Sequence, residues 1–238
     1  MRLLPSLLLS TLLLQGCATA PPATKSDSYV DSSFTAPARG SLFVLLPVNS
    51  GSPDVARGER LVTEQLHRQL IGAGYKVVAL DDANYEVIWT QEIQAVGGIY
   101  DSKTGALKAQ AYSQALAALT RRVALDTRCA MVLKPALVIR QARLSGIGAD
   151  WDGQRRPVPQ VRNYGADSRY DGSIPAISIE LLGLASNGNV AFKTLGGISL
   201  PYRADSLGAR FEVRPDLFAD ATETASGVHI ALTPLLKN

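Results

Sequence analysis

The stretch Ile174–Leu200 reads IPAISIELLGLASNGNVAFKTLGGISL, in which two apolar runs flank Ser186-Asn187-Gly188-Asn189. An Asn-Gly pair between apolar runs is the strongest short-range signal of a β-hairpin. If Asn187 and Gly188 form a two-residue type I′ loop, the register places a nearly continuous apolar set on one side of the hairpin. The expected facing pairs are Ile177 with Ile198, Ile179 with Gly196, Leu181 with Thr194, Gly183 with Phe192, and Ala185 with Val190.

The opposite side of this hairpin is half-polar, with Glu180 facing Leu195 and Leu182 facing Lys193. A slip of one residue would turn Glu180 and Lys193 into the core, so the pattern specifies the register. The expected hairpin therefore has one side that is nearly all apolar.

A strand–helix–strand unit is expected before it. The apolar run Leu42–Val48 is typical of a strand covered on both faces. Ser52 and Pro53 mark a helix start, and the helix should continue to about Ile71, where glycines follow. A second short strand, Tyr75–Leu80, completes a βαβ unit with parallel strands.

Helices and strands then alternate up to the hairpin. A helix is preferred to a strand over Asp81–Val96, and a long Ala-rich helix is expected over Lys103–Arg128. Met131–Leu144 is expected to form a long strand in which Pro135 indicates an edge or a break. The remaining expectations are a partner strand over Ala149–Arg156 and a closing helix over Ala219–Leu236.

These elements define the expected fold class, an α/β (α+β) domain with a mixed sheet. Its parts are an N-terminal βαβ unit, a long Ala-rich helix, two C-terminal antiparallel hairpins and a closing helix.

The first seventeen residues have the pattern of an export signal. A positive start at Arg2 and the apolar run Leu3–Leu14 describe a secretory signal peptide. The apolar run has about a dozen residues, too few to cross a hydrocarbon core of ~30 Å. Leu14-Gln15-Gly16-Cys17 matches a lipobox, which predicts that Cys17 is acylated, for example with palmitate, and becomes the mature N-terminus. Ala18 and Thr19 follow Cys17 in place of the Asp that retains lipoproteins in the inner membrane, so the outer membrane is favoured.

Three segments are therefore expected. Residues 1–16 form the signal peptide, residues 17–40 form a lipidated cysteine and a disordered tether, and residues 41–238 form a single periplasmic domain. The tether is rich in Ala, Pro, Ser and Thr and should not bury enough apolar surface to become ordered. Fully stretched, it would span up to ~75 Å.

Charge and cysteine content narrow the function classes. The formal net charge is +3 at pH 7, and removal of Arg2 leaves about +2, which gives no reason to expect nucleic-acid binding. With Cys17 acylated, Cys129 is left without a partner for an intramolecular disulfide. Its apolar neighbours predict a buried thiol, with an intermolecular disulfide as the alternative.

Short motifs give little sign of catalysis or cofactors. Residues 97–104 resemble a phosphate-binding loop, but Ser102 occupies the place of its second glycine. Asp150 and Asp152 do not complete a calcium loop and are expected to form surface ion pairs with Arg155 and Arg156. Neither a zinc motif nor a common serine-nucleophile signature occurs. We therefore expect no cofactor, no metal and no enzymatic activity.

The best candidate for an interaction site is the long connection Pro157–Ser173. It carries Arg162, Tyr164, Arg169 and Tyr170, and Arg and Tyr are frequent anchors at protein interfaces. Connections of this length are usually either functional or solvated, and both interpretations remain open from the sequence.

The lipobox, the polar tether, the βαβ unit, the long helix and the two hairpins together resemble the small α/β domain of outer-membrane lipoproteins. The comparable families are the curli-secretion, Tol–Pal and peptidoglycan-synthase-activator lipoproteins, and the likeness lies in the order of elements over residues 41–236. This resemblance implies a binding module of the cell envelope and carries over no functional residue.

Three function classes follow. The first is a lipid-anchored, non-catalytic adaptor whose partner is another envelope protein. The second is a periplasmic receptor for a small molecule or a glycan such as peptidoglycan, which a deep apolar pocket would favour. The third is an enzyme of unrecognised type.

Overall fold

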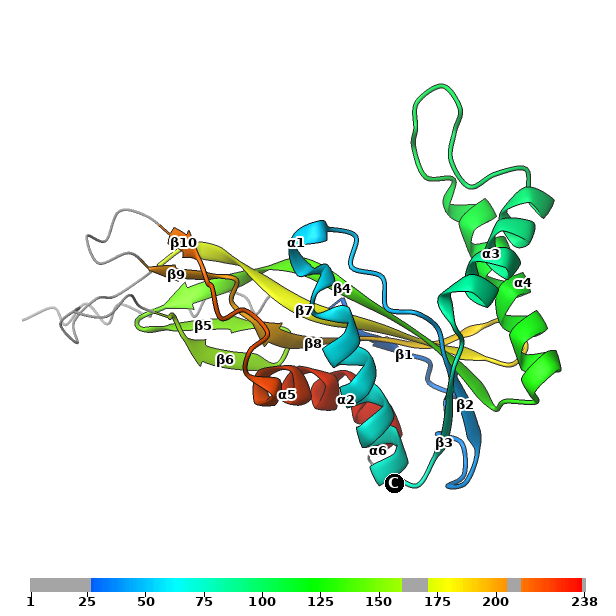
Figure 1. The fold of residues 1–238 in the computed structure, drawn as a ribbon, viewed down its shortest axis with the longest axis horizontal. Coiled ribbons are helices and arrows are strands. Elements are labelled where there is room, and N and C mark those ends of the chain that lie inside the picture. Colours follow the sequence, from blue (N-terminus) through cyan, green and yellow to red (C-terminus); the bar gives the residue numbers. More distant parts are fainter. Residues whose placement is uncertain (1–26, 160–170, 205–210, 237–238) are drawn as a thin grey trace, which may run out of the picture.

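A computed structural model describes residues 27–159, 171–204 and 211–236. It shows an α+β fold built on a mixed, eight-stranded sheet, as expected from the sequence (Figure 1). The strands are β1 (Tyr29–Val30), β2 (Leu42–Leu45), β3 (Lys76–Ala79), β4 (Met131–Ser145), β5 (Gly148–Trp151), β6 (Gln154–Pro157), β7 (Ser173–Ala185) and β8 (Val190–Ser199), with a separate pair β9 (Tyr202–Ala204) and β10 (Phe211–Val213). The helices are α1 (Pro53–Ala56), α2 (Glu59–Gly72), α3 (Asp82–Ala95), α4 (Ala109–Thr127), α5 (Ala221–Ala231) and α6 (Thr233–Leu236).

The long antiparallel pairing of β4 with β7 forms the centre of the sheet. It runs without interruption from Met131 opposite Ala185 to Arg143 opposite Ser173. β8 and then β1 add to β7 on one side, and β2 and then β3 add to β4 on the other. Pro135 lies inside β4 and not at an edge. Pro135 has no N–H to donate, and it follows shortly after Leu133, where the pairing of β4 with β2 ends.

The expected βαβ unit is present. β2 runs parallel to both β3 and β4. Its helix is not continuous over Pro53–Ile71, because α1 ends at Ala56 and α2 begins at Glu59. Between them lies Gly58, and a Cβ at this position would lie 2.5 Å from the ring of Phe218. The aromatic ring therefore packs directly on the backbone where the helix breaks.

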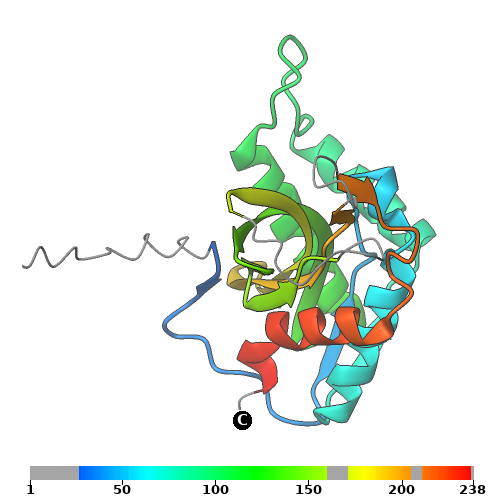
Figure 2. The ribbon, with the colours of Figure 1, turned by 90° about the vertical axis from the view of Figure 1, so that its left-hand side faces the viewer.

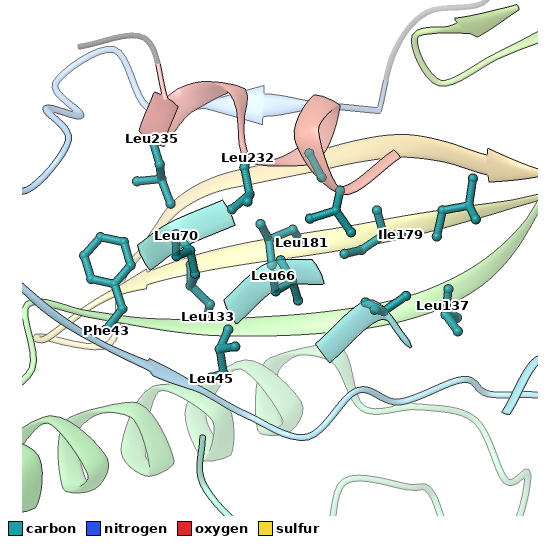
Figure 3. Close-up of a cluster of buried hydrophobic side chains, with 14 of the residues drawn as sticks. Phe43, Leu45, Leu66, Leu70, Leu133, Leu137, Ile179, Leu181, Leu232 and Leu235 are labelled. Atoms are coloured by element: carbon teal, nitrogen blue, oxygen red, sulfur yellow. The ribbon is translucent and has the colours of Figure 1, made fainter. Parts of the chain in front are cut away.

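Helices cover both faces of the sheet. On one face, α2, α5 and α6 bury a cluster that includes Leu66 and Leu232 against strand residues such as Leu133 (Figure 3). On the other face, α4 packs Leu119 and Val123 against Val132. Cys129 is buried in this second cluster, as expected. A third cluster around Trp151 fills the far end of the sheet, where the strands curl (Figure 2).

The central register of the β7–β8 hairpin is as expected, including Leu181 opposite Thr194 and Gly183 opposite Phe192. The two end pairs are wrong, because β-bulges place Ile177 opposite Ser199 and Val190 opposite Leu184. The loop is not type I′ either. The N–H of Gly188 donates to the carbonyl of Ala185, and the N–H of Ala185 donates to that of Asn189.

This pattern is a three-residue loop that ends in a bulge, and of the Asn187-Gly188 pair only Gly188 has a positive φ. A Cβ on Gly188 would lie 2.7 Å from the carbonyl oxygen of Ala117. The loop is thus shaped by its contact with α4, which the local sequence does not reveal.

The expected strand Ala149–Arg156 is two strands. Asp152 (φ 37°) and Gly153 (φ 78°) form a two-residue turn, with Trp151 paired to Gln154 across it. Two consecutive positive φ angles are the requirement of a type I′ loop, and Asp-Gly is a favoured sequence for it. The type I′ hairpin of this fold is therefore β5–β6.

The long helix starts six residues later than expected, because α4 begins at Ala109. Residues 97–108 instead form a projecting turn in which Tyr100 bridges to Leu107. The Asp101 carboxylate accepts hydrogen bonds from the N–H groups of Lys103 and Thr104. Asp101 therefore shapes the segment that resembled a phosphate-binding loop, and Lys103 lies at a turn and not at the start of a helix.

Part of the expected tether is folded. Tyr29 and Val30 pair with Lys193 and Phe192 of β8, and the ring of Phe34 lies 5.4 Å from that of Phe192. The expectation of a disordered segment up to residue 40 is thus wrong from residue 27 onward, and residues 17–26 lie outside the described part. β1 pairs with the edge of β8, which would otherwise be unpaired.

The closing helix is also divided, into α5 and α6, which are separated by Leu232. α5 approaches β8 very closely. A Cβ on Gly196 would lie 1.9 Å from the carbonyl oxygen of Gly227, and one on Gly227 would lie 2.6 Å from the carbonyl oxygen of Gly197. Glycines on both elements are what allow the helix to lie directly on the strand.

We expect Gly196→Ala to destabilise the fold by about 2–3 kcal/mol, because the new methyl group must push α5 away from β8. Gly72→Ala is the matched control, since a Cβ at Gly72 meets nothing within 4 Å and its φ is not positive. The control should leave stability unchanged or raise it slightly. Urea unfolding followed by circular dichroism measures both, and equal midpoints for the two variants would contradict the close approach.

Candidate functional site

A half-open groove of about 1090 Å³ lies on the described part of the chain. It lies between the segment that contains β1, the middle of β4, the β5–β6 turn and the end of α5. Its lining is mixed: Val30, Phe34 and Ile230 are apolar, whereas Arg143 and Arg155 are charged. The groove thus offers both apolar contact area and guanidinium groups.

Asp152 organises the floor of the groove. Its carboxylate accepts a hydrogen bond from the Ser178 hydroxyl at 2.6 Å and one from Nε of Arg140 at 3.1 Å. Its backbone carbonyl accepts from the N–H of Gly197 at 3.0 Å. Asp152 was expected to form a surface pair with Arg155 or Arg156, but its side chain is only 10% exposed and pairs with Arg140. The β5–β6 turn is thereby fixed to three strands of the sheet.

Arg140 connects this floor to the N-terminal segment. Its guanidinium lies 2.9 Å from the carboxylate of Asp27. Burial alone would lower the pKa of Arg140, but the charge of Asp152 and the bonds to Asp27 outweigh it, and the pKa is raised. One arginine thus joins the start of the described chain to the β5–β6 turn.

A ladder of charges runs across the groove wall. Arg143, Asp150 and Arg155 stand opposite one another on β4, β5 and β6. The expected Asp150–Arg155 pair is present at 3.5 Å, and the Arg155 side chain is 67% exposed. Arg143 forms no ion pair with any described residue, so the ladder carries one net positive charge.

A second hollow, of about 470 Å³, is occupied by ion pairs. Arg214 is 8% exposed and binds Asp216 through two hydrogen bonds, and it also contacts Glu223 and the Ser199 hydroxyl. The Asp216 hydrogen bonds raise the pKa of Arg214. Because the donors of Arg214 are engaged within the protein, these ion pairs tie the β10–α5 connection to β8.

The predicted site residues lie outside the described residues. These are Cys17 and the loop residues Arg162, Tyr164, Arg169 and Tyr170. The described ends of their loop are Pro159 and Asp171, and Pro159 lines the second hollow and not the groove. The groove is not apparent from the sequence, because its polar lining comes from segments far apart in the chain, such as those of Thr35, Arg143 and Thr233.

The two histidines do not meet, since His67 lies on α2 and His229 on α5. Within residues 27–159, 171–204 and 211–236, no group of three or more His, Cys, Asp or Glu could hold a metal ion. Over the same ranges, no helix is long and apolar enough to cross a membrane. The groove presents charged, polar and apolar side chains that a ligand could contact. Among the described residues, no nucleophilic side chain is paired with a histidine side chain.

We expect Asp152→Asn to destabilise the fold by about 2 kcal/mol, because it removes the charge that faces Arg140 while Asn still tolerates the positive φ. Asp150→Asn is the control and should cost less than about 0.5 kcal/mol, since its pair is exposed. A double-mutant cycle with Arg140→Gln measures the coupling. Strictly additive losses for Asp152→Asn and Arg140→Gln would contradict the pairing.

Acid should weaken the fold only below about pH 4. Hydrogen bonds from Arg214 and from Thr222 lower the pKa of Asp216 and Asp220, respectively. A carboxyl group with a lowered folded pKa stabilises the protein above its unfolded pKa of about 3.9, and this contribution is lost as the pH falls through the folded value.

We therefore expect a melting temperature that is flat between about pH 5 and 7 and falls in more acidic buffer. Asp220→Asn keeps an N-cap oxygen but cannot titrate. The melting temperature of this variant should therefore fall less between neutral and acidic buffer than that of the unaltered protein. Thermal melts across pH provide the comparison, and identical acid profiles for the two proteins would refute the role of Asp220.

No known protein family matches the chain, and no curated protein matches it. Similar solved structures include two of PelC dodecamers from Paraburkholderia phytofirmans. One has 13% identity and a TM-score of 0.42 over 88% of this chain and 94% of that chain. The other has 13% identity and a TM-score of 0.41 over 86% and 95%. Lipoprotein GNA1162 from Neisseria meningitidis has 14% identity and a TM-score of 0.32 over 66% of this chain and 81% of that chain. The structural neighbours of this chain thus include a bacterial lipoprotein.

Proposed function

We propose that the chain is a lipid-anchored adaptor of the bacterial cell envelope, acylated at Cys17 and held at the periplasmic side of the outer membrane. The observation that carries this proposal is the lipobox Leu14-Gln15-Gly16-Cys17 after a short apolar run. Ala18 and Thr19 after the cysteine support the outer membrane. The processed N-terminus would carry several acyl chains, which is enough for stable anchoring.

The adaptor role is favoured over the receptor role by the shape and lining of the groove. A receptor for a small molecule typically encloses its ligand in a mainly apolar cavity. This groove is half-open and carries the exposed Arg155 together with Arg143, which suits a polar macromolecular surface better. The loop with Tyr164 and Tyr170 supplies further interface-type residues, and the adaptor performs no chemistry of its own.

The receptor for a small molecule or glycan remains the second candidate. It is favoured by the size of the groove and by its several polar side chains, which include Thr35, Gln141 and Thr194. These groups could hydrogen-bond a sugar, so the capture experiment must distinguish protein from glycan.

A photoreactive residue at Tyr164, Tyr170 or Gln141 in intact cells should capture a discrete envelope protein. His67, exposed on α2, is the matched control position and should capture nothing in common with them. The captured species is identified by mass spectrometry, and Cys17→Ala, which removes the acylated thiol, should abolish the capture.

Two outcomes would overturn the adaptor role. Capture of glycan alone would establish the receptor, and no capture at any of the three positions would leave the adaptor without a contact surface. Mass spectrometry of the N-terminal peptide tests acylation separately, so loss of the anchor is not mistaken for loss of the partner.

A further inference from the structure

β3 is the end strand of the sheet, beyond β2 (Figure 1). The N–H groups of Lys76 and Leu80 donate to carbonyls in or beside β2 at 2.9 and 2.8 Å. Because backbone groups alternate in direction along a strand, the N–H and C=O groups of Val77 and Ala79 point away from β2. Among the described residues, no strand pairs with this side of β3. The open side is therefore a row of backbone donors and acceptors that an added strand can bind.

A hollow of about 540 Å³ lies between this edge and α2. Its lining includes Leu45 of β2 and Ala79 of β3, and α2 contributes a stripe with Thr63, His67 and Ile71. Residues four apart lie on one face of a helix, so the stripe follows the length of α2. Proteins that bind a peptide by strand addition combine an exposed sheet edge with pockets for the side chains of the peptide. The β3 edge and this hollow have the same combination.

Exposed apolar side chains flank the edge on both faces of the sheet. Ile71, on the α2 side, is 49% exposed, and Val78 of β3 is 48% exposed. Val78 lies opposite Val44 of β2, which belongs to the cluster under α4, so Val78 is on the α4 side. The side chains of an added strand alternate between the two faces. One set would cover Ile71 and the next would cover Val78, so the strand that fits here has apolar residues at successive positions.

The charged side chains beside the edge are of both signs. Glu64 lines the hollow and is paired with Arg60, and Arg68 lines it without an ion pair to any described residue. Lys76 is exposed at the start of β3, and Asp81-Asp82 follows its end. Net charge thus does not select the partner. An acidic residue of the added strand is placed best beside Lys76, at the end away from Asp81-Asp82.

We propose that the β3 edge, defined as Val77–Ala79 together with the hollow beside α2, binds an extended segment of another protein as an added strand. The backbone groups of Val77 and Ala79 bind the segment, and its successive apolar side chains cover Ile71 and Val78. β3 and β1 are the two end strands of the sheet, so this site is separate from the groove beside β1. The domain can therefore hold two partners at once, and the β3 site does not depend on acylation of Cys17.

Two substitutions with matched controls test the edge. Ala79→Pro removes an N–H that points away from β2, so it keeps the bonds to β2 while its ring blocks an added strand. Ala79→Ser keeps this N–H and is the control at the same position. Val78→Lys puts a charge on the open edge, which opposes strand addition. Its control is Val213→Lys, because Val213 is 62% exposed on β10, at the other end of the molecule in Figure 1.

The probe is a library of short random peptides displayed on phage, selected against the full-length protein in detergent micelles. The selected peptides should contain successive apolar residues, and Ala79→Pro and Val78→Lys should each weaken their binding by roughly tenfold, as the loss of one hydrogen bond would. Ala79→Ser and Val213→Lys should leave binding unchanged. Circular dichroism melts show whether each variant is folded. In the unaltered protein, bound peptide should slow hydrogen exchange of the Val77 and Ala79 amides, which point outward.

Selection of no peptide, or of peptides that bind the Ala79→Pro and Val78→Lys variants as well as the unaltered protein, would overturn the proposal. A second copy of this chain is the alternative occupant of the edge. If the unaltered protein sediments as a dimer and the Ala79→Pro variant as a monomer, the edge is an interface between copies and the proposal fails. Capture at the groove and mass spectrometry of the N-terminal peptide test the adaptor role separately, so either conclusion can fail without the other.

Discussion

The pairing of β4 with β7 is the constraint on which the other parts of the structure depend. Along this ladder, odd-numbered residues such as Leu133 and Leu181 face α2 and α5, and even-numbered residues such as Val132 face α4. Because side chains alternate in a strand, one ladder organises two separate apolar clusters. β2 pairs with the first residues of β4, Met131–Leu133, and β5 pairs with its last residues, Arg143–Ser145. At this second end the sheet curls around Trp151.

This arrangement explains how the N-terminal segment becomes part of the domain. β8 would otherwise be the open edge of the sheet, and β1 covers it near Phe192. Arg140 of β4 then binds both Asp27 before β1 and Asp152 in the β5–β6 turn. The N-terminal segment is thus held to the domain by the same arginine that fixes the β5–β6 turn at the groove.

Local patterns in the sequence were sufficient for most elements. Alternating apolar residues around Leu181 and Thr194 predicted the centre of the hairpin. The helix expected over Asp81–Val96 is present as α3, and the Asp81 carboxylate accepts a hydrogen bond from the N–H of Asn84 at its start. Two of the differences occur where distant parts of the chain are in contact. Gly188 lies against Ala117 of α4, and Gly58, between α1 and α2, lies under the ring of Phe218.

Less of the candidate site than of the fold could be predicted from the sequence. Asp152-Gly153 is a local turn signal inside a segment whose pattern predicted one strand, and only this turn brings Asp152 to the groove. Asp27 lies in a polar, proline-containing segment whose composition indicates a tether. Nothing local shows that Arg140, more than a hundred residues away, binds it.

If Cys17 is acylated as proposed, β1 and the Asp27–Arg140 pair hold the domain close to the membrane. Neutron reflectometry of the acylated protein on a supported bilayer measures the solvent gap between the lipid head groups and the protein layer. We expect a gap of no more than about 35 Å, the fully extended length of the ten positions from Cys17 to Asp27, and this gap should widen when Asp27→Ala weakens the attachment of β1. A gap approaching ~75 Å in the unaltered protein would show that the whole segment up to residue 40 is a free tether, and it would contradict the account.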